Sequence, residues 1–107
     1  MKTKLLFICT ANLDRSPCAE SLFENSEKYE ASSAGIGLLT ENPVTKEIID
    51  WADEIFVMEY EHKVLLREKF GDIDKDVVVL GVSNEFCRYD EELEKVLRIN
   101  LEKEEVL

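Results

Sequence analysis

Short strand-like runs alternate with longer amphipathic segments along this chain. Apolar or alternating residues predict strands at residues 4–9, 29–34, 54–58 and 77–82. Apolar residues spaced three or four positions apart predict helices at residues 17–28, 43–52, 62–70 and 90–104. Because strands and helices of these lengths alternate regularly, we expect a three-layer α/β/α fold with a four-stranded parallel sheet. Ligands of such sheets bind beyond the carboxyl ends of the strands, where Cys9 and the segment after Val82 are expected to meet.

Several residues mark where the predicted helices begin and end. Asn42 and Pro43 predict the N-cap and the first position of the second helix. Gly71 is expected to end the third helix, and Asp90 to cap the last one.

The size and charge of the chain limit the classes of function. Its 107 residues, 45% of them hydrophobic, suit one domain over residues 1–107 that needs no disulfide or metal to fold. The 24 acidic and 13 basic residues give a net charge of −11, which disfavours nucleic acids and anionic membranes as partners.

Cysteine usage and the N-terminal segment indicate a cytoplasmic protein. Three cysteines, without the spacing of a disulfide framework or a metal site, fit a reducing compartment, and we expect no metal or other cofactor. The first apolar run is followed closely by Asn12 and Asp14, too early for a signal peptide or a membrane span.

The segment from Cys9 to Pro17 joins the first predicted strand to the first predicted helix. Cys9 ends the strand, five loop residues follow, and Arg15 precedes Ser16 and Pro17. Loop amides and the unpaired N–H groups of a helix start can bind one anion, while a guanidinium holds two of its oxygens. These surroundings also stabilise a thiolate, so we expect Cys9 to be ionised at neutral pH, with Ser16 capping the helix and donating to the sulfur. For Cys9 taken alone, a buried core cysteine is the alternative interpretation.

This segment, from Leu6 to Glu20, resembles the phosphate-binding loop of the low molecular weight protein tyrosine phosphatases. The likeness continues in Ser33–Gly35, Trp51–Glu59 and Asp90–Leu93, and it is closest to a short branch of predicted phosphatases of about this length. It implies the phosphotyrosine phosphatase I-like fold and attack of the Cys9 thiolate on phosphorus, giving a phosphocysteine that water hydrolyses. The partners that it implies are phosphorylated proteins, small aryl phosphates, and inorganic phosphate or another oxyanion.

The motif and the resemblance together define the expected site. The residues expected to act in catalysis are Cys9, Arg15, Ser16 and Asp90. The residues expected to bind substrate are Thr10, Ala11, Asn12, Leu13, Asp14, Asn84 and Phe86. Asn12 matches the family's loop asparagine, and we expect it to adopt a positive φ that aims the amides inward. Tyr60 is a further candidate for the wall of the substrate slot, whereas we expect His62, the only histidine, to be structural rather than catalytic.

Three loop positions depart from the family's pattern. Ala11 stands where many relatives have glycine, which is compatible with the loop if φ there is negative. Asp14 replaces a second cysteine, so the protective disulfide that the resemblance would imply is missing, and we expect its carboxylate to point outward. Asn84 replaces the aspartate that protonates the leaving group in relatives.

The replacement at position 84 bears directly on activity. General acid catalysis contributes about 10²- to 10⁴-fold, and an amide side chain does not supply it. Glu85 and Asp90 are the candidate substitutes, and aryl phosphates with good leaving groups are expected to suffer least.

Two other classes of function stay open. A non-catalytic module that binds phosphate or phosphopeptides is favoured by Asp14 and Asn84. A thiol-dependent arsenate reductase is the third hypothesis; Cys87 lies in a suitable distal segment, but a second relay thiol is missing.

Overall fold

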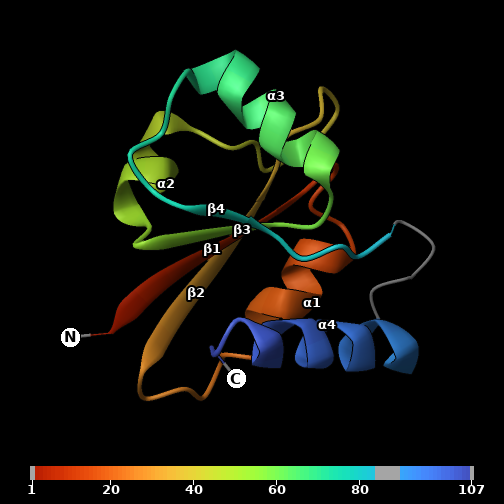
Figure 1. Ribbon diagram of the computed structural model, residues 1–107. Helices are drawn as coiled ribbons and strands as arrows, with labels where there is room; N and C mark the ends of the chain where they lie inside the picture. Colours follow the sequence, from red (N-terminus) through yellow and green to blue (C-terminus); the bar gives the residue numbers. More distant parts are fainter. Residues whose placement is uncertain (1, 84–89, 107) are drawn as a thin grey trace.

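A four-stranded parallel sheet forms the centre of the molecule (Figure 1). The structure is a computed structural model that describes residues 2–83 and 90–106. Along the chain the elements are β1 (Thr3–Cys9), α1 (Arg15–Ser21), β2 (Tyr29–Gly35), α2 (Lys46–Trp51), β3 (Glu54–Val57), α3 (Tyr60–Phe70), β4 (Val77–Val79) and α4 (Glu91–Lys103). The strand order is β2-β1-β3-β4, so β1, which carries Cys9, lies inside the sheet between two partners.

Helices cover both faces of the sheet, as the alternation of elements predicted. Successive side chains of a strand point to opposite faces. Leu5, Phe7 and Cys9 accordingly belong to the core on the side of α1 and α4, while Leu6 and Ile8 belong to the core on the side of α2 and α3. All five side chains are buried, which explains why β1 reads as a continuous apolar run. The expected three-layer α/β/α fold is confirmed.

The first helix is shorter than the sequence indicated. It ends at Ser21 instead of continuing to residue 28, and the next bonds are tighter turns from the Leu22 and Phe23 amides to the carbonyls of Ala19 and Glu20. Phe23 still packs in the core, so the apolar spacing was correct although the helix boundary was wrong.

The predicted start of the second helix was also wrong. Thr45 is its N-cap, with Oγ1 accepting the Ile48 N–H at 3.2 Å, and α2 begins at Lys46. The Asn42 side chain instead bonds to Asn12 Oδ1 and the Ser33 carbonyl. The expected ends of the other two helices are confirmed, since Gly71 (φ 76°) terminates α3 and Asp90 caps α4 through the Glu92 N–H.

The carboxyl end of the sheet brings distant segments together. There the end of β1 is bonded to residues 36 and 37, and the Val82 N–H donates to the Met58 carbonyl. Within residues 2–83 and 90–106, no helix is long and apolar enough to cross a membrane.

Candidate functional site

The sulfur of Cys9 lies at the end of β1, where hydrogen-bond donors converge on it. The residue is 3% exposed. The Asn12 N–H points at Sγ with an N–S distance of 3.2 Å, and Ser16 Oγ lies 3.0 Å from the same atom. Ser16 Oγ accepts a hydrogen bond from Asn12 Nδ2 at 2.8 Å, so the hydroxyl proton of Ser16 is free to be donated elsewhere. The Cys9 sulfur is a closer acceptor for that proton than the Ala34 carbonyl, which lies 3.4 Å from Ser16 Oγ. Two donors aimed at one sulfur stabilise its anionic form.

Three successive carbonyls at the start of the loop point away from the sulfur. The bonds that hold them are Ile36 N to Cys9 O (2.9 Å), Gly37 N to Thr10 O (2.8 Å) and Thr40 Oγ1 to Ala11 O (2.8 Å). In a planar trans peptide the C=O and the following N–H point in opposite directions. The amides of residues 10, 11 and 12 therefore point away from residues 36–40, and the Asn12 N–H meets the Cys9 sulfur.

Asn12 has the positive φ that the sequence predicted. Its φ is 59°, and among the non-glycine residues that the structure describes only Asn12 and Glu105 have positive values. Ala11 therefore avoids the conformation that would have required glycine. The Asn12 side chain holds the turn from both ends, since Nδ2 donates to Ser16 and Oδ1 accepts from Asn42 Nδ2 at 2.9 Å.

The guanidinium of Arg15 is buried beside this loop and oriented by two acceptors. The side chain is 5% exposed, and Nη1 donates to the Val82 carbonyl at 2.7 Å and lies 3.3 Å from Glu59 Oε1. Among residues 2–83 and 90–106 the contacts of the guanidinium are at Nη1, which leaves the edge formed by Nε and Nη2 for an anion, the geometry of bidentate oxyanion recognition.

His62 connects α3 to the first residue of the loop. It is 1% exposed; Nδ1 accepts the Glu59 N–H at 3.1 Å, so the ring proton lies on Nε2, which donates to Thr10 Oγ1 at 2.9 Å. Burial, the largest cause, and the Arg15 guanidinium together lower the pKa of His62 from 6.5 to about 4, against the opposing effect of Glu59. The imidazole is therefore neutral at pH 7 and acts as a fixed bridge.

Most of the expected site residues meet at this loop. The structure brings together Cys9, Thr10, Ala11, Asn12, Arg15 and Ser16. Ser16 contacts the sulfur as expected but is not the helix cap, because α1 begins at Arg15 with Asp14 in the N-cap position. Leu13 is 65% exposed beside the loop, and Asp14 is half-buried.

Other expected residues lie elsewhere or outside the described part of the chain. Asn84, Glu85, Phe86 and Cys87 are among residues 84–89, which the structure does not describe. Asp90 is exposed and its Oδ1 accepts the Glu92 N–H at 2.9 Å, so its role as helix cap is confirmed while its role as an acid stays a prediction. Tyr60 is 68% exposed at the start of α3, directly after Glu59.

Sequence reasoning missed the residues that support the loop from outside. Thr40 was not singled out, Asn42 was interpreted as a helix cap, and Glu59 was noted only as part of the resemblance. Their partners are 29, 30 and 44 positions away along the chain, at Ala11, Asn12 and Arg15. The only signal was indirect, since all three residues follow the carboxyl ends of predicted strands.

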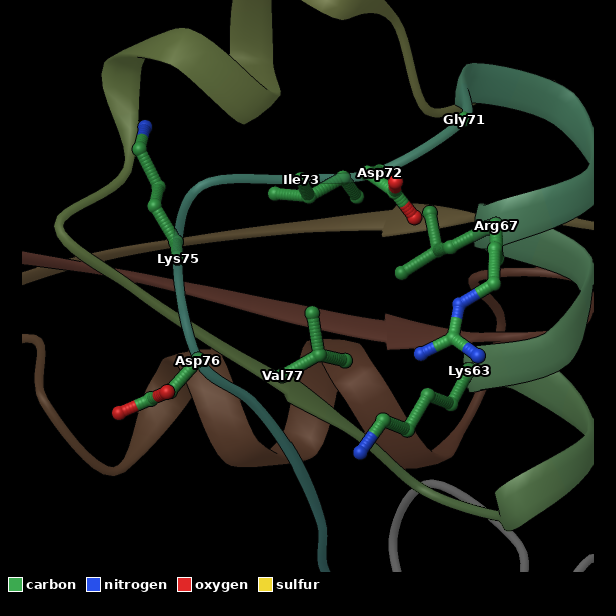
Figure 2. A pocket seen from close by; sticks show the side chains of 9 residues that line it. Lys63, Arg67, Gly71, Asp72, Ile73, Lys75, Asp76 and Val77 are labelled. Atoms are coloured by element: carbon green, nitrogen blue, oxygen red, sulfur yellow. The ribbon is translucent and has the colours of Figure 1, made fainter.

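A separate cavity of about 300 Å³ lies between α3 and residues 71–77 (Figure 2). It is lined by Lys63, Arg67, Asp72, Lys75, Asp76 and by backbone and apolar side chains. None of the expected site residues lines it, and its charged side chains are of both signs. The chemistry is therefore assigned to the loop at Cys9.

Comparison with known proteins agrees with this geometry. The family model described as low molecular weight phosphotyrosine protein phosphatase matches residues 4–74. A relative from Bacillus subtilis (strain 168), named protein-arginine-phosphatase, is 29% identical over 94 residues, covering 63% of this chain and 63% of its own length. A relative of the same name from Geobacillus stearothermophilus is 32% identical, covering 65% and 64%. The matched region thus spans just under two thirds of these relatives.

Solved structures share the fold. The low molecular weight protein tyrosine phosphatase SP-PTP from Streptococcus pyogenes superposes with a TM-score of 0.80 at 18% identity, covering 100% of this chain and 94% of that one. A YwlE mutant from Bacillus subtilis gives a TM-score of 0.71 at 23% identity, covering 96% and 98%. Because the matching family model includes Cys9, the loop, Arg15 and the supporting Glu59 and His62, the chain belongs to the low molecular weight phosphotyrosine protein phosphatase family.

Proposed function

We propose that the protein hydrolyses phosphate monoesters through a phosphocysteine formed on Cys9. The observation that carries this proposal is the convergence of the Asn12 N–H and Ser16 Oγ on the Cys9 sulfur, beside a buried Arg15 whose guanidinium is anchored at Nη1 by Val82 and Glu59. Inward amides and a guanidinium edge around one thiolate suit a dianion held against a nucleophile.

In the first step the Cys9 thiolate attacks phosphorus in line and the bond from phosphorus to the leaving oxygen breaks. The electron pair goes to that oxygen, which departs as an alcohol if an acid protonates it or as a phenolate if none does. In the second step water attacks phosphorus, the S–P bond breaks, and the thiolate and inorganic phosphate are released. Arg15 and the loop amides bind the three equatorial oxygens throughout and stabilise their charge in both transition states.

The acid of the first step is Asp90, because one carboxylate can cap a helix through one oxygen and keep the other for a proton. Asp90→Asn is the suitable variant, since asparagine caps a helix about as well as aspartate but carries no acidic proton. We expect it to slow phenyl phosphate hydrolysis by about 10²- to 10⁴-fold and p-nitrophenyl phosphate hydrolysis far less.

The proposed substrates are phosphotyrosine in proteins and small aryl phosphates, and inorganic phosphate or another oxyanion should compete with them. The names of the two curated relatives favour a second candidate, arginine phosphate in proteins. We also place the protein in the cytoplasm, because its sequence has three cysteines without the spacing of a disulfide framework.

Turnover of four substrates by three proteins tests the proposal. The substrates are p-nitrophenyl phosphate, phenyl phosphate, a phosphotyrosine peptide and a phosphoarginine peptide; the proteins are the wild type, Cys9→Ser and Cys18→Ser. We expect turnover by the wild type, none by Cys9→Ser, and retention by Cys18→Ser, the matched control on α1. Phosphate binding without turnover would instead support the binding module, and arsenite formed from arsenate with a thiol reductant would support the reductase.

A further inference from the structure

We propose that Thr40 is a positioning residue whose hydroxyl holds the Ala11–Asn12 peptide so that its N–H faces the Cys9 sulfur. The inference rests on the proposed function for its kinetic consequence. Thr40 lies between β2 and α2, 31 positions from the nucleophile, and it is not part of the C-x5-R-S-P motif. It acts on the reaction only through the loop backbone.

The geometry links the hydroxyl to the sulfur through a single peptide unit. Thr40 Oγ1 donates to the Ala11 carbonyl at 2.8 Å on one side of that unit, and the Asn12 N–H meets the Cys9 sulfur at 3.2 Å on the other. A planar trans peptide places these two groups in opposite directions, so fixing the carbonyl fixes the amide. Rotation of the unit by half a turn would direct a carbonyl oxygen at the thiolate and at the phosphate, which both repel it.

Of the three successive carbonyls of Cys9, Thr10 and Ala11, the Ala11 carbonyl is the one held by a side chain among the described residues. The two preceding carbonyls are held by the backbone amides of Ile36 and Gly37, which most substitutions leave in place. The Ala11 carbonyl is held by a side-chain hydroxyl. It is followed by Asn12, whose φ of 59° is a conformation that L-residues other than asparagine and aspartate seldom adopt. Without the hydrogen bond from Thr40 Oγ1, the Ala11–Asn12 peptide is held less firmly in the orientation that directs its N–H at the sulfur.

Among the described residues, the surroundings of Thr40 leave its hydroxyl proton one acceptor. Oγ1 accepts the Asn42 N–H at 3.2 Å, so its single proton is left for the Ala11 carbonyl. Gly35 makes room for the approach, because a Cβ there would lie 2.5 Å from Thr40 Oγ1. The Asn42 amide group then ties the same segment to Asn12 and to the Ser33 carbonyl. The hydrogen bonds of this segment therefore direct the Thr40 hydroxyl at the Ala11 carbonyl.

Thr40→Val and Thr40→Ser form a matched pair, since the first keeps the shape without the hydroxyl and the second keeps the hydroxyl. For Thr40→Val we expect kcat for p-nitrophenyl phosphate to fall at least about tenfold and at most by the 10²- to 10³-fold that the loss of one oxyanion donor costs. KM should change much less than kcat, because the other amides and Arg15 still bind the phosphate. Thr40→Ser should recover kcat to within about threefold of the wild type, as one retained hydrogen bond predicts.

Alkylation of Cys9 by iodoacetamide gives a readout that needs no substrate. All proteins in this experiment carry Cys18→Ser and Cys87→Ser, so Cys9 is the remaining thiol of the sequence. Loss of the Asn12 contact removes one donor from the sulfur and leaves the reacting thiolate less stabilised, so the rate of alkylation at pH 7 should fall in Thr40→Val and return in Thr40→Ser. A general loss of folding would expose Cys9 and raise this rate instead.

The outcomes are distinguishable. Thr40→Val with kcat within twofold of the wild type and an unchanged rate of Cys9 alkylation overturns the inference, and so does a loss that Thr40→Ser does not restore. If the valine variant does not fold, Thr40→Ala carries the same expectation. If the wild type hydrolyses no phosphate ester, the proposed function fails, but the alkylation rates of the same proteins still decide the role of Thr40.

Discussion

Protonation of His62 at acid pH should lower the free energy of unfolding of the protein. The imidazole is 1% exposed and both of its nitrogens are already used, Nδ1 as an acceptor from Glu59 and Nε2 as a donor to Thr10. A second proton would occupy Nδ1 and oppose the Glu59 N–H. It would also place a positive charge near Arg15, which Glu59 compensates in part.

The magnitude follows from the lowering of the His62 pKa from 6.5 to about 4. Above pH 6.5 the ring is neutral in both the folded and the unfolded chain, so this contribution to stability is complete. Between pH 6.5 and 4 the unfolded chain binds the proton and the folded chain does not, so the free energy of unfolding falls as the pH falls. At about 1.4 kcal/mol for each pKa unit, the loss approaches about 3 kcal/mol by pH 4.

Urea unfolding at pH 7, 6, 5 and 4 measures this loss, with His62→Gln as the variant that does not titrate in this range. Carboxylates titrate in both proteins, so the difference between their pH profiles isolates His62. We expect the wild type to lose about 3 kcal/mol more than His62→Gln between pH 7 and pH 4. Lys63→Gln, a change at the neighbouring residue in the cavity of Figure 2, should leave the wild-type pH profile unchanged. Parallel profiles for the wild type and His62→Gln would refute the reasoning, as would a steeper loss in the variant.

Two further predictions concern the loop and the charge of the molecule. In Gly35→Ala the new Cβ would lie 2.5 Å from Thr40 Oγ1 and 2.8 Å from the Thr10 carbonyl oxygen. We therefore expect the free energy of unfolding, measured in urea, to fall by about 1–3 kcal/mol, and kcat to fall as well. Wild-type values for both would contradict the packing described for this turn. Because the net charge is −11, kcat/KM for a dianionic aryl phosphate should rise when salt is increased from about 10 to 200 mM, since screening weakens the repulsion of the substrate; a fall with salt would show that local positive charge dominates the encounter.

The fold and the centre of the site could be predicted because local sequence determines them. A run that is buried on both faces, such as residues 5–9, identifies an inner parallel strand without further information. Cys9, Asn12, Arg15 and Ser16 are close in the chain, so their spacing already constrains how they meet in space. The positive φ of Asn12 was predictable for the same reason.

The errors and omissions come from contacts between distant segments. Asn42 is a good helix cap by local rules, but its side chain bonds to Asn12 and Ser33, and Thr45 caps α2 instead. Glu59 and His62 support both ends of the loop from α3, and nothing near them in the sequence indicates Arg15 or Thr10 as their partners. Residues that orient a site from outside are therefore the ones that a motif alone does not identify.

Chemical trapping of the intermediate tests the central claim most directly. The protein is mixed with a phosphotyrosine peptide or p-nitrophenyl phosphate, quenched within the first turnovers, digested, and searched for phosphate by mass spectrometry. We expect phosphate on the peptide that contains Cys9, lost on a second incubation without substrate as water hydrolyses the S–P bond. Turnover with no phosphate on Cys9 at any quench time, or turnover that persists in Cys9→Ser, would contradict it.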